Sequence, residues 1–290
     1  MLTSAFIAEV QRQAQTPGNV TDAELLLVGD SIVRGRIVPL LRECGSNFLV
    51  RQATLALDAQ GRARLPQRAV GATLRHVALV SGSSSVALEQ VGLESIWAPG
   101  SGSPLGYYLD AGTVVAVPPG ATGSLMVRYE VSPGSMVSDT DTSQSARVTN
   151  VSAGVSTTTV TVAVFGGATA NGLDLVSSGP AHECIAVSAP VTGTYVFTNA
   201  DLNGAVLAGD YLTMPRVTPF VPVPEELTAA VSLLAAGEVL RHLGYLQEAR
   251  AALDTGLEAL AATRAALVPR NAGNPRAIRG GMRAALRRWW

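Results

Sequence analysis

Ser31 is the residue whose type and position most directly suggest covalent chemistry. It follows Gly29 and Asp30 after the apolar run Leu25–Val28. A serine hydroxyl becomes a nucleophile when a histidine takes its proton and a carboxylate orients that histidine. The candidate bases are His76 in a strand pattern, His182 in a loop rich in Gly and Pro, and His242 near a helix end.

The segment Leu25–Ile32 resembles the first sequence block of the GDSL-type, or SGNH, esterases, in which the serine is the nucleophile. That family supplies its base from a late Asp-x-x-His motif, and this sequence contains no Asp-x-x-His. The segment also has the pattern of a capped helix, because Thr21 and Glu24 form a capping box ahead of apolar residues at helical spacing. We therefore predict a helix here and no enzyme.

Other clusters of chemically active residues are sparse. Cys44 and Cys184 are too few for a disulfide framework or a zinc site. Asp139 and Asp141 lie two residues apart in a Ser/Thr-rich stretch, but the rest of a calcium-loop pattern is missing. The chain has no lysine, so it has no phosphate-binding loop that ends in Gly-Lys. We predict no metal site and no cofactor.

Charge is distributed unevenly along the chain. Residues 259–290 contain seven arginines and no acidic residue, whereas residues 1–258 contain the other 14 arginines and all 22 acidic residues. The basic stretch alternates arginine with apolar residues and includes two tryptophans, and Arg and Trp are both frequent in protein docking sites. It predicts an arm that docks on another protein. The docking residues are Arg270, Arg276, Ile278, Arg279, Met282, Arg283, Leu286, Arg287, Arg288, Trp289 and Trp290.

The overall composition favours many short strands and a surface partly covered by neighbours. Hydrophobic residues make up 47% of the 290 residues, charged residues only 15%, and Gly, Ala, Val, Ser and Thr are abundant. The sequence shows no signal-peptide pattern and no apolar run near the roughly 18 residues needed to cross a bilayer. We expect a soluble protein, made in a reducing compartment, with no membrane partner.

Helical patterns occupy both ends of the sequence. Thr3–Ala14 and Thr21–Leu41 predict N-terminal helices, and Pro39 should kink the second helix or end its regular part. Residues 225–268 predict a pair of antiparallel helices, with Gly244 as the C-terminal cap of the first.

Between these helices the pattern changes to strands punctuated by Gly, Pro, Asn and Ser. The predicted strands are Phe48–Leu57, Leu74–Val80, Thr113–Val117, Ser124–Val131 and Val155–Phe165. The predicted fold class is α+β, with helical N- and C-terminal segments around a β-rich middle and an extended C-terminal arm. The predicted domains are N-terminal helices (1–47), a β-rich body (48–137), a β-rich insertion (138–215), a C-terminal helical hairpin (225–268) and a basic, aromatic arm (269–290).

Several segments, taken in order, resemble the head-to-tail connector proteins of tailed bacteriophages, the adaptors that sit beneath the portal. Asp22–Leu41 is similar to the family's opening helix, and Leu65–Val77 to its Ile-Pro-x-Arg-Ala-x-Gly-x-x-Leu-Arg-x-Val stretch. Gly209-Asp210-Tyr211 precedes the proline-rich approach to the closing helix pair and basic tail. The segments similar to the family's strand–turn–strand unit are Gly106–Tyr108, Val115–Pro119 and Leu125–Tyr129.

The resemblance implies a structural virion protein at the head–tail junction, made in the host cytoplasm. It implies a homo-oligomeric ring, usually of twelve copies, that joins the portal protein to a downstream tail protein. DNA would pass through its channel during ejection without specific binding. By this resemblance the arm from Arg270 to Trp290 docks on the portal. Arg68 and Arg75 either contact neighbouring subunits or, as such residues commonly do, stay in solvent or pair with local acids. The alternatives are an SGNH-like esterase that uses Ser31, and a tail module that binds carbohydrate or a receptor.

Overall fold

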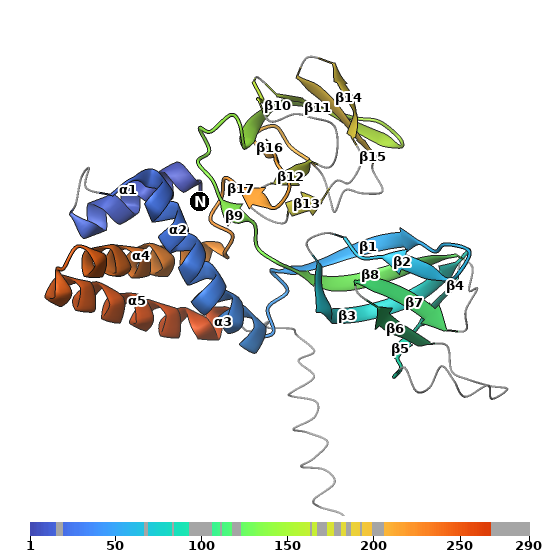
Figure 1. The fold of residues 1–290 in the computed structure, drawn as a ribbon, viewed down its shortest axis with the longest axis horizontal. Coiled ribbons are helices and arrows are strands. Elements are labelled where there is room, and N and C mark those ends of the chain that lie inside the picture. Colours follow the sequence, from blue (N-terminus) through green and yellow to red (C-terminus); the bar gives the residue numbers. More distant parts are fainter. Residues whose placement is uncertain are drawn as a thin grey trace, which may run out of the picture.

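The computed structural model has a mixed α+β fold in three parts, a helical unit, a body of two small sheets and a further β-rich unit (Figure 1). The structure describes residues 1–15, 20–66, 69–82, 84–92, 106–110, 112–117, 123–162, 164–166, 173–176, 181–183, 187–191, 193–198 and 206–267. Arg68 and every residue predicted to dock on the portal lie outside this described part.

The helical unit contains helices from both ends of the sequence. Its elements are α1 (Thr3–Ala14), α2 (Asp22–Ile32), η1 (Val33–Ile37), α3 (Val38–Glu43), η4 (Glu225–Leu227), α4 (Thr228–His242) and α5 (Leu246–Leu267). Helix α4 contacts α1 and α2 as well as α5, and it lies between them in Figure 1. The prediction of separate helical segments around a β-rich middle is therefore wrong. The two sets of helices cover each other's apolar faces and form one unit beside the strands.

Two local signals determine the course of α2 into α3. The Glu24 N–H donates to Thr21 Oγ1 while the Thr21 N–H donates to the Glu24 carboxylate, so the predicted capping box is confirmed. The hydrogen bonds that the Glu24 carboxylate accepts from the Thr21 N–H and hydroxyl lower the pKa of Glu24. Pro39 has no N–H to donate to the carbonyl four residues earlier, and the chain passes through the π-helical turn η1 just before it. The regular part of the helix ends before Pro39, as predicted.

Helices α4 and α5 approach closely because each has a glycine opposite a leucine of the other. A Cβ on Gly237 would lie 2.7 Å from Leu253 Cγ and 3.1 Å from the Ala249 carbonyl oxygen. A Cβ on Gly256 would lie 2.9 Å from Leu234 Cγ. Both contacts are shorter than carbon atoms normally allow, so neither glycine can gain a side chain without separating the helices.

The turn between α4 and α5 is a glycine C-cap of the Schellman type. Gly244 has φ +88°, a left-handed conformation that favours glycine. Its N–H donates to the Arg241 carbonyl at 3.2 Å, and the Tyr245 N–H donates to the Leu240 carbonyl at 2.9 Å. The cap predicted at Gly244 is confirmed.

The body consists of two four-stranded sheets whose buried residues belong to one apolar cluster with the helices. Val114, Leu125 and Val127 are fully buried, and Tyr107 is nearly so. The first sheet has the order β1 (Val50–Ala56), β8 (Ser124–Val131), β3 (Ala69–Ser81), β4 (Ser84–Ala87). The second has the order β2 (Arg62–Arg64), β7 (Thr113–Val117), β6 (Gly106–Asp110), β5 (Glu89–Gln90).

The third part is a seven-stranded antiparallel sheet with its own apolar cluster. Its order is β13 (Ala181–Glu183), β12 (Asp174–Val176), β16 (Tyr211–Thr213), β10 (Ser145–Ala153), β11 (Thr157–Val162), β15 (Thr194–Thr198), β14 (Val187–Val191). The chain enters through β9 (Ser135–Met136) and leaves through β17 (Val217–Thr218), and these two strands pair in parallel beside the helices. The sheet is therefore attached to the rest of the molecule by two adjacent strands.

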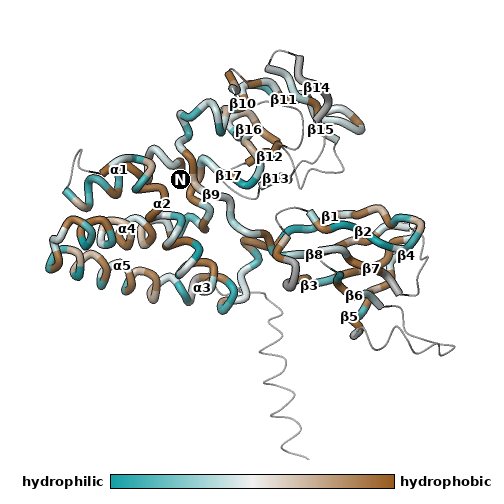
Figure 2. The backbone as a smooth tube through the Cα atoms, in the orientation of Figure 1, coloured by the Kyte–Doolittle hydropathy of each residue, from teal (hydrophilic) through white to brown (hydrophobic). Residues whose placement is uncertain are grey.

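Hydrophobic residues are spread over all three parts of the molecule (Figure 2). Within the described residues, no helix combines the length and the apolar character needed to cross a bilayer.

We expect an added methyl group to have opposite effects at a helical glycine that is tightly packed and at one beside open space. We expect Gly237→Ala to destabilise the protein by about 1–2 kcal/mol, because overpacking against Leu253 outweighs the better helix propensity of alanine. At Gly35, in η1, no atom lies within 4 Å of the place a Cβ would occupy, so Gly35→Ala should stabilise by about 0.5–1 kcal/mol. Urea unfolding of both variants measures the difference, and equal shifts would contradict the close packing of α4 on α5.

Candidate functional site

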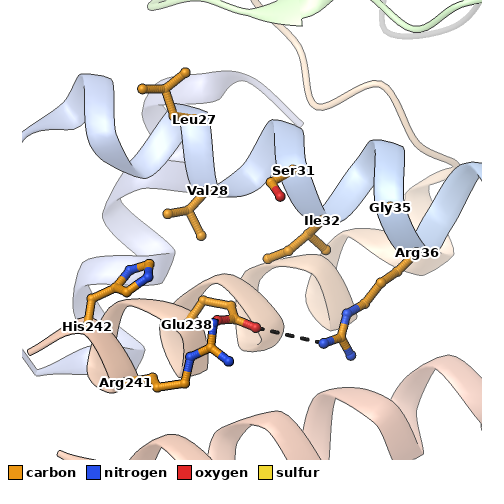
Figure 3. Close-up of a pocket in the computed structure, with 9 residues that line it drawn as sticks. All are labelled: Leu27, Val28, Ser31, Ile32, Gly35, Arg36, Glu238, Arg241 and His242. Carbon is orange, nitrogen blue, oxygen red and sulfur yellow. Dashed lines mark ion pairs between the residues drawn. The ribbon is translucent and has the colours of Figure 1, made fainter. Parts of the chain in front are cut away.

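A pocket of about 510 Å³ lies between α2–η1 and α4 (Figure 3). We call it the helical groove. The α2 side contributes mainly apolar residues and the α4 side contributes charged ones. Its lining residues are Leu27, Val28, Ser31, Ile32, Gly35, Arg36, Glu238, Arg241 and His242.

Two arginines share one carboxylate in the helical groove. Glu238 Oε2 lies 2.5 Å from Arg241 Nη2, and Glu238 Oε1 lies 3.7 Å from Arg36 Nη2. The Glu238 side chain is only 15% exposed, whereas the side chains of Arg36 and Arg241 are 42% and 55% exposed. One carboxylate cannot neutralise two guanidinium groups, so the groove has an excess positive charge that faces solvent.

The π-helical turn shapes the groove at its Arg36 end. The Val38 N–H donates to the Val33 carbonyl, five residues back, which widens the helix at this point. Gly35 lies within the turn, and no atom lies within 4 Å of the position a Cβ would take. The groove is therefore open here to the backbone of another chain.

The structure brings Ser31 and His242 to the same groove but does not connect them as a catalytic pair. Among the described residues, no hydrogen bond joins Ser31 to His242, and Val28 lies between them in Figure 3. Glu238, the carboxylate among the residues that line the groove, is engaged by the two arginines. Ser31 also lies in a helix, as predicted, and not at a strand end. In the described part of the chain, the groove offers Ser31 no oriented base for nucleophilic attack.

Packing explains the residues that precede Ser31. A Cβ on Gly29 would overlap Met136 Cε and lie 2.9 Å from the Phe6 ring, so the glycine allows α1, α2 and β9 to meet. Asp30 accepts a hydrogen bond from the Met136 N–H at 3.0 Å. Burial raises the pKa of Asp30 above its ordinary value. The esterase-like tripeptide is thus a packing contact between α2 and the strand that leads into the seven-stranded sheet.

The remaining candidate residues lie in strands or make hydrogen bonds within the fold. His76 lies exposed on β3, and His182 lies in β13, so its assignment to a loop was wrong. Asp139 accepts hydrogen bonds from the Ser4 N–H at 3.0 Å and the Ser4 hydroxyl at 2.9 Å, and so caps α1. Asp141 accepts from the Ser143 N–H at 3.0 Å. Over the described residues, no group of three His, Cys, Asp or Glu side chains has the arrangement of a metal site.

Arg75 pairs with a buried acid in its own chain. Glu130, on β8, is 2% exposed, and Arg42 of α3 contacts one of its oxygens directly. Arg75 Nη2 lies 3.7 Å from the other oxygen. Glu130 therefore connects the body to the helical unit through Arg42, whereas Arg75 lies on the neighbouring strand β3 of the body itself. Gly71, four residues before Arg75, lies inside β3 where the pairing with β8 shifts register.

Sequence reasoning missed the helical groove as a site. The three-residue spacing of Glu238 and Arg241 on one helix is a usable signal for an ion pair. The sequence could not assign Arg36 to this ion pair, because the direction of the Arg36 side chain depends on the π-helical turn ahead of Pro39. Neither the models of known protein families nor the curated proteins match this sequence.

The raised pKa of Asp30 predicts that the stability difference between the natural protein and an Asp30 variant depends on pH. A carboxyl group with a raised pKa in the folded state contributes stability at low pH and loses it as pH rises through that folded pKa. Asp30→Asn cannot titrate and can still accept the Met136 N–H bond. We expect the stability of Asp30→Asn relative to the natural protein to increase from pH 4 to pH 7, measured by urea unfolding. A relative stability that falls over this range would show that the ionised carboxylate is favoured.

We expect removal of the Glu130 charge to cost more stability than removal of an exposed ion pair. Glu130→Gln keeps the size of the side chain but removes the charge between Arg42 and Arg75, and should reduce the free energy of unfolding by about 1–3 kcal/mol. The control is Arg250→Gln, whose pair with Asp254 is exposed and 4.0 Å long, and which should change stability by less than about 0.5 kcal/mol. Equal effects in thermal unfolding would mean that Glu130 does not connect the two parts.

Proposed function

We propose that this protein is a structural head-to-tail adaptor of a tailed bacteriophage virion, which forms a ring beneath the portal and continues the DNA channel toward the tail. In this proposal the helical unit is the base of the arm, the arm binds the portal, and the β-rich parts form the wall of the ring. The downstream face would meet the next tail protein.

One observation carries the proposal: the basic, aromatic segment follows a helix whose end is fixed. Arg264 Nη2, in the last turn of α5, lies 3.3 Å from Glu43 Oε2 at the end of α3. Next to it, Cys44 Sγ donates to the Arg264 carbonyl at 3.8 Å. The chain therefore leaves the helical unit at a defined point, next to the junction with the body. A docking arm needs such a fixed base, because ordering a free tail would oppose binding.

The alternatives have less support. An esterase would need an oriented base beside Ser31, and the groove supplies none among the described residues. A carbohydrate- or receptor-binding module would use the β-rich parts and would leave the Arg/Trp segment without a role. A recognition role for the helical unit accounts for the fixed end of α5 and for the charge excess of the helical groove together.

Binding to the portal protein encoded near this chain tests the proposal. We expect the full-length chain to add a stoichiometric set of copies to the portal, seen by native mass spectrometry, and a chain ending at Val268 to add none. A matched variant, Trp289→Ala with Trp290→Ala, keeps the length and charge of the arm. It should weaken binding at least tenfold, because buried tryptophans commonly contribute about 2 kcal/mol or more to an interface.

Each other outcome revises a different part of the proposal. If the shortened chain binds as well as the full-length chain, the arm is not the dock. If neither chain binds the portal at any salt concentration tried, the adaptor function is wrong.

A further inference from the structure

Exposed apolar side chains gather at one end of the helical groove. The α4–α5 turn exposes Leu243, Tyr245 and Leu246 by 36%, 51% and 67%. The turn directly follows His242, which lines the groove. Leu27 of α2 is also exposed, by 68%, but its side chain points away from α4 in Figure 3. Large exposed apolar residues that gather in one place commonly mark an interaction site. The groove and the turn together form a surface that is both apolar and positively charged.

The charge of this surface restricts what can cover it. Arg36 and Arg241 share a single carboxylate, so a complementary partner should bring acidic groups. The chain's own C-terminal segment, residues 268–290, contains no acidic residue and several arginines, and would be repelled. The occupant must be an acidic surface with small side chains near Gly35.

The outer face of α5 has these properties. Glu248 and Glu258 are exposed there, and neither has an ion-pair partner among the described residues. Leu257 is 44% exposed and lies at the edge of this face, about 100° around the helix from Glu258. The residues on the same stripe as Glu258 are small, Ala251, Thr255 and Ala262, and the exposed pair of Arg250 with Asp254 lies beside them. Small residues let two helical backbones approach closely.

We infer that the outer face of α5 of one copy docks in the helical groove of a second copy. In this contact the acidic groups of α5 meet Arg36 and Arg241, and Leu257 meets the apolar residues of the groove and turn. Helix α4 lies between the groove-forming α2 and helix α5, so the two surfaces are different and cannot pair with themselves. Such a head-to-tail contact can be repeated from copy to copy, and it produces a ring when its rotation closes. The inference rests on the proposed ring-forming function and identifies its lateral contact.

Two complementary variants of the full-length protein test the contact. Gly35→Phe fills the groove where space is open, and Glu258→Arg with Leu257→Asp alters only α5. We expect each variant alone to self-associate at least tenfold more weakly than the natural protein, measured by sedimentation velocity. An equimolar mixture of the two should form a 1:1 dimer, because each pair of copies then retains one intact groove and one intact α5 face.

Charge exchange provides a second measurement if Gly35→Phe does not fold. Arg241→Glu and Glu258→Arg should each weaken self-association, and a chain carrying both should recover most of it. Val155→Asp, at a fully exposed residue of the seven-stranded unit, should change nothing. Self-association that survives either altered surface, or a mixture that stays monomeric, would overturn the contact.

The portal experiment separates this inference from the proposed function. If the groove variant still adds a full set of copies to the portal, the lateral contact is wrong and the adaptor function stands. If the natural protein self-associates through the groove but never binds the portal, the adaptor function fails and the contact between copies stands. A natural protein that binds the portal but never self-associates, alone or on the portal, also overturns the contact.

Discussion

The burial of α4 is the constraint on which the rest of the structure depends. Eight of its fifteen residues, from Ala230 to Leu240, are less than 9% exposed apolar or hydroxyl side chains. A helix this apolar on most sides is unstable in water until other helices cover it. Helices α1 and α2 cover one side and α5 covers the other. Because α4 follows all the strands in sequence, the N-terminal helices cannot complete their core until most of the chain has been made.

Polar contacts then fix the positions of the strands relative to this helical core. Asp30 binds the backbone of β9, Asp139 caps α1 from the chain beyond β9, and Glu130 binds Arg42 of α3. In each case a carboxylate of one part accepts a hydrogen bond or ion pair from a donor in another part. The relative position of helices and strands is therefore fixed by directional polar contacts as well as by buried apolar area. The parallel pairing of β9 with β17 brings the entry and exit of the seven-stranded unit together at the same place. That unit has its own core, which explains how it can be attached through so few residues.

Local signals in the sequence predicted where helices begin and end, whereas long-range packing determined which residues are buried and which residues line the groove. The capping box at Thr21, the cap at Gly244 and the end of the regular helix ahead of Pro39 follow from backbone chemistry within a few residues, and all three are confirmed. Leu257 has the spacing of a core residue yet is exposed, because only the side of α5 that faces α4 is covered. Gly71 lies inside β3, in the stretch between Ala69 and Leu74 where the pairing with β8 shifts register. The helical groove could not be predicted, since it depends on a π-helical turn and on contact between α2 and α4, far apart in sequence.

The tripeptide Gly29-Asp30-Ser31 illustrates why a motif must be judged by its surroundings. Each residue type has a separate physical cause here: glycine because Phe6 and Met136 leave no room, aspartate because the Met136 N–H needs an acceptor, and serine because the position faces the groove. None of these causes requires a reaction. The same region presents two partly exposed arginines, an open glycine and an exposed turn of apolar residues, features that are useful for binding a surface and of little use in bond cleavage. These features of the helical unit are therefore the ones on which we base the proposed recognition of another protein surface.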